Sequence, residues 1–335
     1  MTITIQNTTP RRDIHGRIID CHDGCLRHFE GRYYLYGTRY GNTDGFTRAN
    51  RYVCYSSPDL ENWTPHGEIL DRFPDGIGYR PYVAWNPKTS RYVLWFNWYP
   101  ELWDGQYGVA VASQPEGPYQ LVAERTPVVM PQPGDHNLMV DDDGAGYLIY
   151  TSITETPDGH HHLSIERLDE TMTTSTQENS GIIDSYVEAP ALFRRDRWCY
   201  AIFGKTCCFG QQGSDARVYR SRDPLGPWSW AAEINRREDG TIVVPGQQTD
   251  VTALPTAEGV QWVWMADLWG SRPDGIKGHD LQHWEPLTFG SDGLPLTLEG
   301  CRTWSLTRPL QVHVKSDITP RRPGKASVSS TASPR

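Results

Sequence analysis

A glutamate in the segment DSYVEAPALFRRDRWCYAIFG, residues 184–204, lies where an ionisable side chain is unusual. Glu188 lies between Val187 and Ala189, and a run of strand-forming aromatic residues follows it. Apolar surroundings disfavour the charged form of a carboxyl group, so that such a group can hold a proton near neutral pH and act as a general acid. The alternative is a glutamate at the start of a strand that points into water.

Two aspartates occupy equivalent positions elsewhere in the chain. Asp23, in RIIDCHDGCLRHFEGRYYLYGT, and Asp135, in PGDHNLMVDDDGAGYLIYTS, each precede an aromatic-rich segment, as Glu188 does. Carboxyl groups that meet in one site but differ in environment can divide the roles of acid and base. This chemistry requires a fold that brings the three positions together.

The aromatic-rich segment is an internal repeat. It occurs as EGRYYLYGT, TSRYVLWFN, GAGYLIYTS, RDRWCYAIFG and GVQWVWMAD, starting at residues 30, 89, 144, 195 and 259. Each copy has the alternating pattern of a strand, and each unit has room for four short strands. Repeated units of this size predict an all-β fold, a five-bladed β-propeller. The innermost strands of a propeller surround one axis, so we expect the three carboxylates to meet in a central funnel.

Length and composition agree with a single large domain. The chain has 335 residues, and we assign residues 1–317 to one propeller domain. Residues 318–335, ITPRRPGKASVSSTASPR, are polar and nearly free of large apolar groups, so we expect a disordered tail. The seven cysteines form an odd set without a Cys-x-x-Cys pair, which favours reduced thiols over disulfides or zinc ligands: Cys21, Cys25, Cys54, Cys199, Cys207, Cys208 and Cys301.

The charge pattern excludes several classes of partner. There are 32 Lys and Arg against 41 Asp and Glu, a net charge of −9, and no basic stripe that could neutralise phosphates, so we expect no nucleic acid partner. No segment approaches the roughly 20 apolar residues of a membrane span. The first residues, MTITIQNTTPRRDIHG, contain no apolar stretch of signal-peptide length, so we expect a cytoplasmic location.

With these motifs in place, the chain resembles glycoside hydrolase family 43, a family of five-bladed propeller glycosidases, over about residues 15 to 290. The resemblance rests on the carboxylates ahead of the first, third and fourth segments, the EAP context of Glu188 and the DDDG turn after Asp135. It implies that Asp23 is the general base, that Asp135 orients the acid and tunes its pKa, and that Glu188 is the general acid. In an inverting glycosidase the acid protonates the leaving oxygen while the base activates water.

The resemblance also bears on the substrate. CHDG (21–24), RPYVAW (80–85), VDDDG (140–144), MADLW (265–269) and the two glutamines of PGQQTDV are most similar to exo-acting galactan β-galactosidases. It therefore implies an inverting exo-hydrolase that releases a terminal sugar from an oligosaccharide, with galactose favoured. That branch can use a glutamine as base, and Gly24 follows Asp23 where the family commonly has proline, so Gln248 is the alternative base.

Other activities stay open. Within the same family the alternatives are an α-L-arabinofuranosidase and a β-xylosidase. A propeller that binds sugars without cleaving them is an alternative of another class, but the presence of all three carboxylates favours the enzyme. A transferase or phosphorylase would need a basic phosphate-binding cluster, which the sequence does not reveal. The oligomeric state is not indicated.

Aromatic and polar residues outside the triad are candidates for sugar binding. In WFNWYPELWDG, residues 95–105, we assign Trp95 to packing and place Trp98 and Trp103 in a loop as stacking platforms. Further substrate-binding candidates are Gln248, Trp269 and Arg272.

A metal site is not expected. DGHHH, residues 158–162, and the DDDG turn are interpreted as solvated hairpins. Gln247 and Gln248 stand where many family members have a histidine near a central cation. We therefore expect no cofactor, and a structural calcium ion is the remaining alternative.

Overall fold

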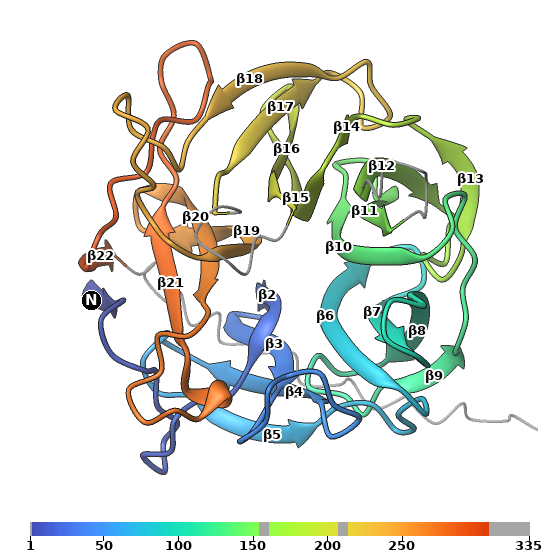
Figure 1. Cartoon of the computed structure of the whole chain (residues 1–335), viewed down its shortest axis with the longest axis horizontal. Helices are drawn as coiled ribbons and strands as arrows, with labels where there is room; N and C mark the ends of the chain where they lie inside the picture. The colour runs from blue at the N-terminus through green and yellow to red at the C-terminus, as the bar shows by residue number, and fades with distance from the viewer. Residues whose placement is uncertain (1, 154–160, 207–213, 308–335) are drawn as a thin grey trace, which may run out of the picture.

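The structure, a computed structural model, describes residues 2–153, 161–206 and 214–307. These residues form five small antiparallel sheets around one axis, the five blades of a β-propeller (Figure 1). The predicted fold class is therefore confirmed. The predicted tail, the boundary at residue 317, Cys207 and Cys208 lie outside the described residues.

The blades follow one another along the chain. Blade 1 contains β2 (His22–Phe29), β3 (Arg32–Arg39), β4 (Arg51–Ser57) and β5 (Thr64–Glu68). Blade 2 contains β6 (Ile77–Asn86), β7 (Arg91–Tyr99), β8 (Gln106–Ala112) and β9 (Gln120–Ala123). Blade 3 contains β10 (Pro133–Val140), β11 (Gly146–Ile153), β12 (His161–Leu168) and β13 (Ser175–Asn179), with the short β14 (Asp184–Ser185) paired to β12.

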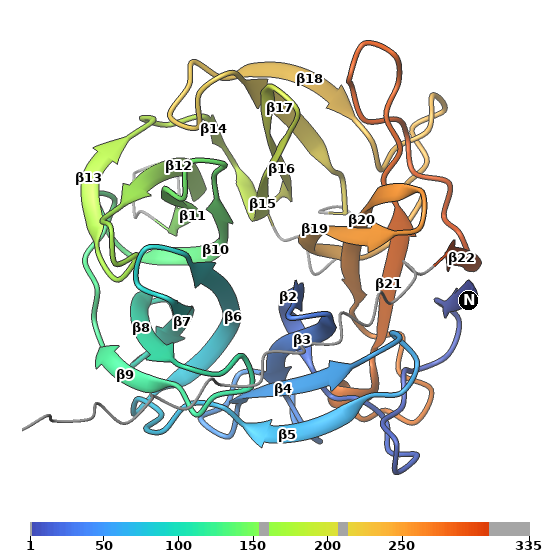
Figure 2. The same ribbon diagram turned by 180° about the vertical axis from the view of Figure 1, so that it is seen from behind.

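The second half of the ring is completed by two further blades. Blade 4 contains β15 (Val187–Arg195), β16 (Trp198–Lys205), β17 (Arg217–Ser221) and β18 (Ser229–Glu233). Blade 5 contains β19 (Gln247–Thr256), β20 (Gly259–Leu268) and β21 (Leu281–Pro286), and the short 3-10 helix η2 (Lys277–His279) precedes β21. Figure 2 shows the same ring from behind.

Each predicted aromatic segment coincides with the second strand of a blade, namely β3, β7, β11, β16 or β20. This strand pairs with a neighbour on both sides and packs against the adjacent blades, so its aromatic residues are buried. Tyr36, Trp95, Tyr150, Tyr200 and Trp264 are each at most 1% exposed. Burying one such side chain contributes on the order of 2 kcal/mol to the free energy of unfolding, which explains why the repeat is rich in aromatic residues.

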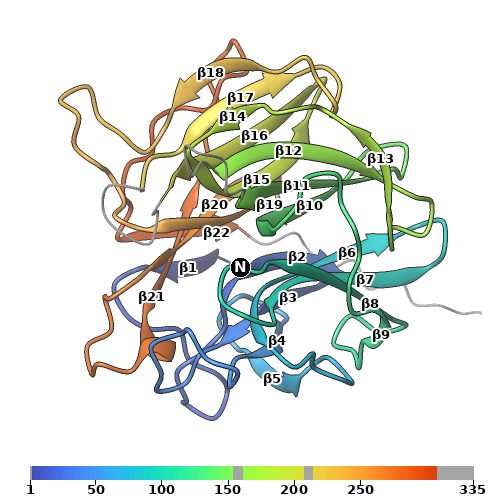
Figure 3. The same cartoon turned by 45° about the vertical axis from the view of Figure 1, so that its right-hand side comes forward.

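Blade 5 has three strands rather than the four expected for each unit. The outer edge of its last strand, β21, is covered by a separate two-stranded sheet of β1 (Thr2–Gln6) and β22 (Thr303–Thr307), which lie side by side (Figures 1 and 3). Asn7 donates to and accepts from the backbone of Trp284, at 2.8 and 3.0 Å, and the Trp304 indole donates to the same carbonyl. The two ends of the described chain thus protect an edge that would otherwise be open to pairing.

The five cysteines that the structure describes, Cys21, Cys25, Cys54, Cys199 and Cys301, are free thiols, and all but the half-buried Cys301 are buried. In the same part of the chain, no helix is long and apolar enough to span a membrane.

Candidate active site

A cavity of about 720 Å³ opens at the end of the propeller where the innermost strands begin. All five innermost strands contribute to its lining, through Asp23, Arg80, Asp135, Glu188 and Gln247. The structure therefore brings the three predicted carboxylates into one site, although they are separated by 112 and 53 positions in the sequence.

Every innermost strand has a β-bulge at this end, and Asp23, Arg80 and Asp135 lie within the bulges of their strands. The register shifts lie between His22 and Cys25, Tyr79 and Tyr82, Pro133 and His136, Glu188 and Ala191, and Gln248 and Asp250. Asp23, Arg80 and Ala189 adopt left-handed φ angles of 57°, 50° and 53° in these bulges. Such conformations are costly for residues other than glycine and cluster at functional sites.

Gly24, in the first bulge, explains a departure from the family pattern. A Cβ atom at this position would lie 1.9 Å from the carbonyl oxygen of Tyr36 on the neighbouring strand. The close approach of β2 and β3 therefore requires glycine where the family commonly has proline.

Asp135 connects the second blade to the fourth. One carboxylate oxygen accepts a hydrogen bond from Nε of Arg80 at 2.7 Å, and the other accepts from the Ala189 N–H at 3.0 Å. Burial raises the pKa of Asp135, the Arg80 guanidinium opposes this rise, and the negative charge of Glu188 adds to it. Because it holds the peptide next to Glu188, Asp135 is placed to orient that side chain. Arg80, which is 2% exposed, is a site residue that the sequence analysis missed.

Replacing Asp135 by asparagine is expected to lower kcat by roughly 10- to 100-fold, since small misplacements of a catalytic group have effects of this size. Removing the negative charge of Asp135 also removes its repulsion of the ionised form of Glu188, which makes loss of the acid's proton easier. The alkaline arm of the pH–rate profile should therefore move to lower pH.

The matched control for this variant is Asp141→Asn, at the opposite end of β10, where Asp141 pairs with Arg194 on the far side of the blade from the cavity. The Asp141→Asn variant should leave both arms of the pH–rate profile at the pH values of the wild type. A profile of Asp135→Asn that coincides with that of the wild type would reduce Asp135 to a structural residue.

Glu188 lies beside a histidine from the third blade. Its Oε1 is 2.7 Å from Nδ1 of His161, at the start of β12. The interpretation of DGHHH as a solvated hairpin missed this residue, while residues 158–160 lie outside the described part. His161 is the first residue of β12 and pairs with Ile153 at the end of β11, the second strand of its blade. Second strands run toward the cavity end, and this is the signal that would have pointed to His161.

Asp23 is 4% exposed and held on two sides. The Tyr40 hydroxyl donates to its carboxylate, and its own N–H donates to Asp267 at 2.7 Å. Burial raises the pKa of Asp23, and the Arg80 guanidinium opposes this rise. The group is thus a carboxylate of increased basicity within a cavity, which suits a general base.

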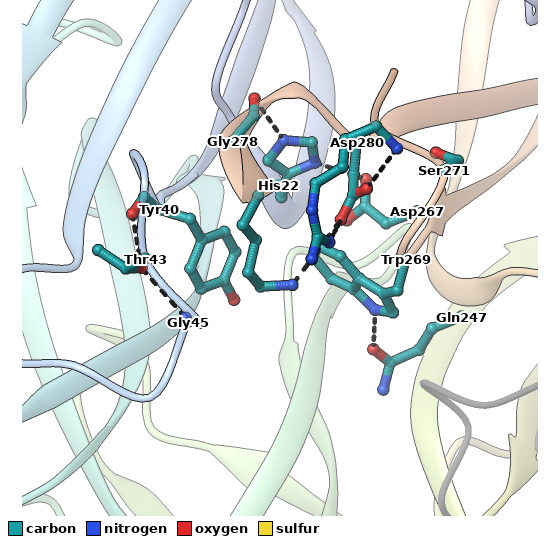
Figure 4. A network of polar contacts seen from close by, with 12 residues as sticks. His22, Tyr40, Thr43, Gly45, Gln247, Asp267, Trp269, Ser271, Gly278 and Asp280 are labelled. Atoms are coloured by element: carbon teal, nitrogen blue, oxygen red, sulfur yellow. Dashed lines mark hydrogen bonds and ion pairs between the residues drawn. The ribbon is translucent and has the colours of Figure 1, made fainter. Parts of the chain in front are cut away.

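His22, next to Asp23 in the chain, contacts Asp267 and Gly278 (Figure 4). Its Nδ1 lies 3.1 Å from Asp267 and its Nε2 lies 3.1 Å from the carbonyl oxygen of Gly278. Both partners only accept hydrogen bonds, so both ring nitrogens must be protonated. Burial lowers the pKa of His22, but the charge and hydrogen bond of Asp267 outweigh burial and raise it to about 9. The imidazolium thereby joins Asp23 to the turn that carries Lys277.

The fifth blade forms one wall of the cavity. Trp269 donates from its indole to Gln247 at 2.7 Å (Figure 4), and Arg272 binds Asp280 at 3.3 Å. Trp269 and Arg272 line the cavity, where the sequence analysis expected substrate-binding residues. The Lys277 ammonium lies 3.7 Å from the centroid of the Trp269 ring, and Lys277 is another cavity residue that was missed.

The structure places two of the predicted substrate-binding residues outside the lining of the cavity. Trp98 is not in a loop: β7 continues to Tyr99, and Trp98 is 2% exposed with its indole bound to the carbonyl oxygen of Glu124 at 2.7 Å. Gln248 is also 2% exposed, and its Nε2 donates to the carbonyl oxygens of Ala189 and Ile202 at 2.9 and 2.7 Å. Trp98 therefore packs, and Gln248 holds the backbone next to Glu188.

The structure places the other two tryptophans of the segment 95–105 in different surroundings. Trp95 is fully buried, as expected of a packing residue. Trp103 is 52% exposed and lines the cavity, where a sugar ring can reach it.

No group of three or more His, Cys, Asp or Glu side chains that could hold a metal ion occurs among residues 2–153, 161–206 and 214–307. Near the propeller axis, the buried Asp250 is bound by the Arg27 guanidinium and, at 2.9 Å, by the amide of Asn137. This carboxylate therefore has a cation of the chain itself as its partner.

Known proteins are similar to this chain in sequence or in fold. A fungal relative, the β-D-galactofuranosidase xynD of Aspergillus niger, is 27% identical over 229 residues, which cover 61% of each chain, so the present chain spans less than two thirds of that enzyme. A solved family 43 β-1,3-galactosidase with galactodeoxynojirimycin is 25% identical with a TM-score of 0.72 over 87% of this chain and 97% of that one. An exo-β-1,3-galactanase from Clostridium thermocellum shares the fold at 23% identity, with a TM-score of 0.74 over 91% and 68%.

The sequence profile of glycosyl hydrolases family 43 matches residues 20–295, which include all five blades and the whole lining of the cavity. With the three carboxylates in one cavity of a five-bladed propeller, the chain belongs to glycosyl hydrolases family 43.

Proposed function

We propose that this glycoside hydrolase is an inverting exo-enzyme that releases a terminal galactose from an oligosaccharide. Glu188 protonates the leaving oxygen, Asp23 removes a proton from the attacking water, and Asp135 orients Glu188. The observation that carries the proposal is that Asp23 and Glu188 enter one cavity from the first and fourth of five blades. Residues on opposite sides of a funnel leave room for water between them.

Exo-action is supported by the structural neighbours, which include exo-β-1,3-galactanases. In this proposal the terminal unit of the sugar chain is bound by the carboxylates at the starts of the innermost strands. Hydrolysis by this route uses only side chains of the protein, and we propose that no cofactor takes part.

Two ring forms of galactose are candidates. The structural neighbours include a β-1,3-galactosidase, whereas the curated relative is named a β-D-galactofuranosidase. α-L-Arabinofuranose and β-xylose are further alternatives within the family. Aryl β-galactopyranoside, β-galactofuranoside, α-L-arabinofuranoside and β-xyloside assayed side by side will identify the sugar, and we expect the first to be cleaved fastest.

The stereochemical course tests the mechanism. Inversion requires the carboxyl groups of Asp23 and Glu188 to stand roughly 6.5–9.5 Å apart, whereas retention requires about 5–5.5 Å. We therefore expect the first sugar released to have the anomeric configuration opposite to that of the bond cut, which proton NMR during early turnover will detect. Retention would exclude single displacement, and binding of the glycosides without turnover would indicate a sugar-binding propeller instead.

A further inference from the structure

Four large apolar side chains are exposed at the mouth of the cavity. Phe46, Leu102, Trp103 and Tyr186 are between 41% and 52% exposed, and all four line the cavity. They make up four of the eleven large hydrophobic side chains that are exposed in the described part of the chain. Exposed apolar residues that gather at one place indicate a binding surface, and we refer to these four as the apolar rim.

The apolar rim is assembled from three blades. Phe46 lies in the connection between β3 and β4, Leu102 and Trp103 follow β7, and Tyr186 precedes β15. Trp103 and Tyr186 have left-handed φ angles of 73° and 62°, which are unfavourable for bulky residues. Such conformations persist where the surrounding structure imposes them, and they concentrate at ligand sites.

The backbone around Tyr186 shows how its position is imposed. Its N–H donates to the carbonyl oxygen of His161 at 2.8 Å, and its carbonyl oxygen accepts from the N–H of Thr206 at 2.8 Å. Tyr186 is thereby tied to the third blade and to the end of β16. It also lies two residues before Glu188, so its place in the rim is linked to that of the proposed acid.

The proposed catalytic groups are more buried than the apolar rim. The inner part carries the charged groups Asp23, Arg80, Asp135 and Glu188, which are half-buried or buried, whereas the four rim residues are exposed, as is Asp44 beside Phe46. A terminal sugar that is bound by hydrogen bonds belongs with the polar inner part. The leaving group is then directed outward, past Glu188, and its first ring must pass between the rim residues.

We propose that the apolar rim is the leaving-group subsite and that it binds the apolar face of a ring, either a second sugar or an aromatic aglycone. This inference rests on the proposed function. Stacking on aromatic side chains favours a ligand with a flat apolar face, and it depends little on where the hydroxyl groups of that ligand lie. The site therefore selects the terminal sugar strictly and accepts different leaving groups, provided that they contain a ring.

The test compares three substrates with the same terminal sugar: methyl β-galactopyranoside, phenyl β-galactopyranoside and β-1,3-galactobiose, or the same leaving groups on the sugar that the glycoside panel selects. For each, kcat/KM of Trp103→Ala is divided by that of the wild type, which cancels the different reactivities of the leaving groups. We expect roughly tenfold losses for the two ring-bearing leaving groups, in line with aromatic stacking, and a change of less than about twofold for methyl. Phe46→Ala, from another blade, should show the same pattern.

Trp230→Ala is the matched control, because Trp230 is 55% exposed on β18 and does not line the cavity. Trp230→Ala should leave kcat/KM unchanged for all three substrates. A loss confined to the phenyl glycoside or to the disaccharide supports the subsite and identifies the ring it serves. Equal losses on all three substrates, or no loss on any, would overturn the inference while leaving the hydrolase assignment intact. A wild-type protein that cleaves none of the glycosides would overturn the proposed function and the inference with it.

Discussion

Replacing Glu188 by glutamine is expected to lower kcat on an unactivated disaccharide by roughly 10²- to 10⁴-fold, the usual contribution of general acid catalysis. The amide has the shape of the carboxyl group but cannot deliver a proton to the leaving oxygen. The fold should be retained, because glutamine can keep the contact with His161 and the backbone of Ala189 stays bound to Asp135 and Gln248. The measurements are kcat for the disaccharide and the melting temperature of both proteins.

An activated substrate provides the internal control for this variant. A dinitrophenyl glycoside has a leaving group that needs little protonation, so its loss of rate should be much smaller than that of the disaccharide. Equal losses on both substrates would point to a binding or folding defect. Near-full activity on the disaccharide would remove Glu188 from the acid role.

Replacing Asp23 by asparagine is expected to lower kcat/KM by a similar factor, roughly 10²- to 10⁴-fold, since the amide cannot accept a proton from water. The pH dependence makes this prediction specific. Burial raises the pKa of Asp23, so in the wild type the rate should fall on acidification already above the ordinary aspartate value of about 3.9, as the base becomes protonated. In Asp23→Asn this acidic arm should be absent from the residual activity.

Asp44→Asn is the matched control, because Asp44 also lines the cavity but is exposed in the connection between β3 and β4. Its carboxylate accepts only the Phe46 N–H at 2.9 Å among the described hydrogen bonds, and asparagine can replace that acceptor. The pH–rate profile of Asp44→Asn should keep both its acidic and its alkaline arm. An unchanged rate in Asp23→Asn would transfer the base role to another residue, and Gln247, which lines the cavity, is a better candidate than Gln248, which does not.

The number of blades and the place of the carboxylates in them follow from local sequence. The second strands β3, β7, β11 and β16 are buried along almost their whole length, and their aromatic residues form a pattern that is visible without knowledge of the fold. The repeat then relates Asp23, Asp135 and Glu188 to one another, because equivalent places in a circular fold meet at the axis. The family resemblance added roles to these positions.

The identity of the other cavity residues was decided only by the tertiary structure. Gln247 and Gln248 are neighbours on β19, and successive side chains of a strand point to opposite faces, so a bulge or a shift of one residue determines which of them faces the cavity. Trp98 and Trp103 differ because β7 continues to Tyr99 before the chain turns outward.

Arg80, His161 and Lys277 come from three different blades, and their approach to the carboxylates depends on how the blades pack around the ring. The sequence by itself thus determined the repeat, the fold and the three carboxylates, since each of these can be recognised from residues that are close together in the chain. The partners that tune the carboxylates were decided by the tertiary structure, because contacts between blades and the direction of a side chain at a bulge have no local signature.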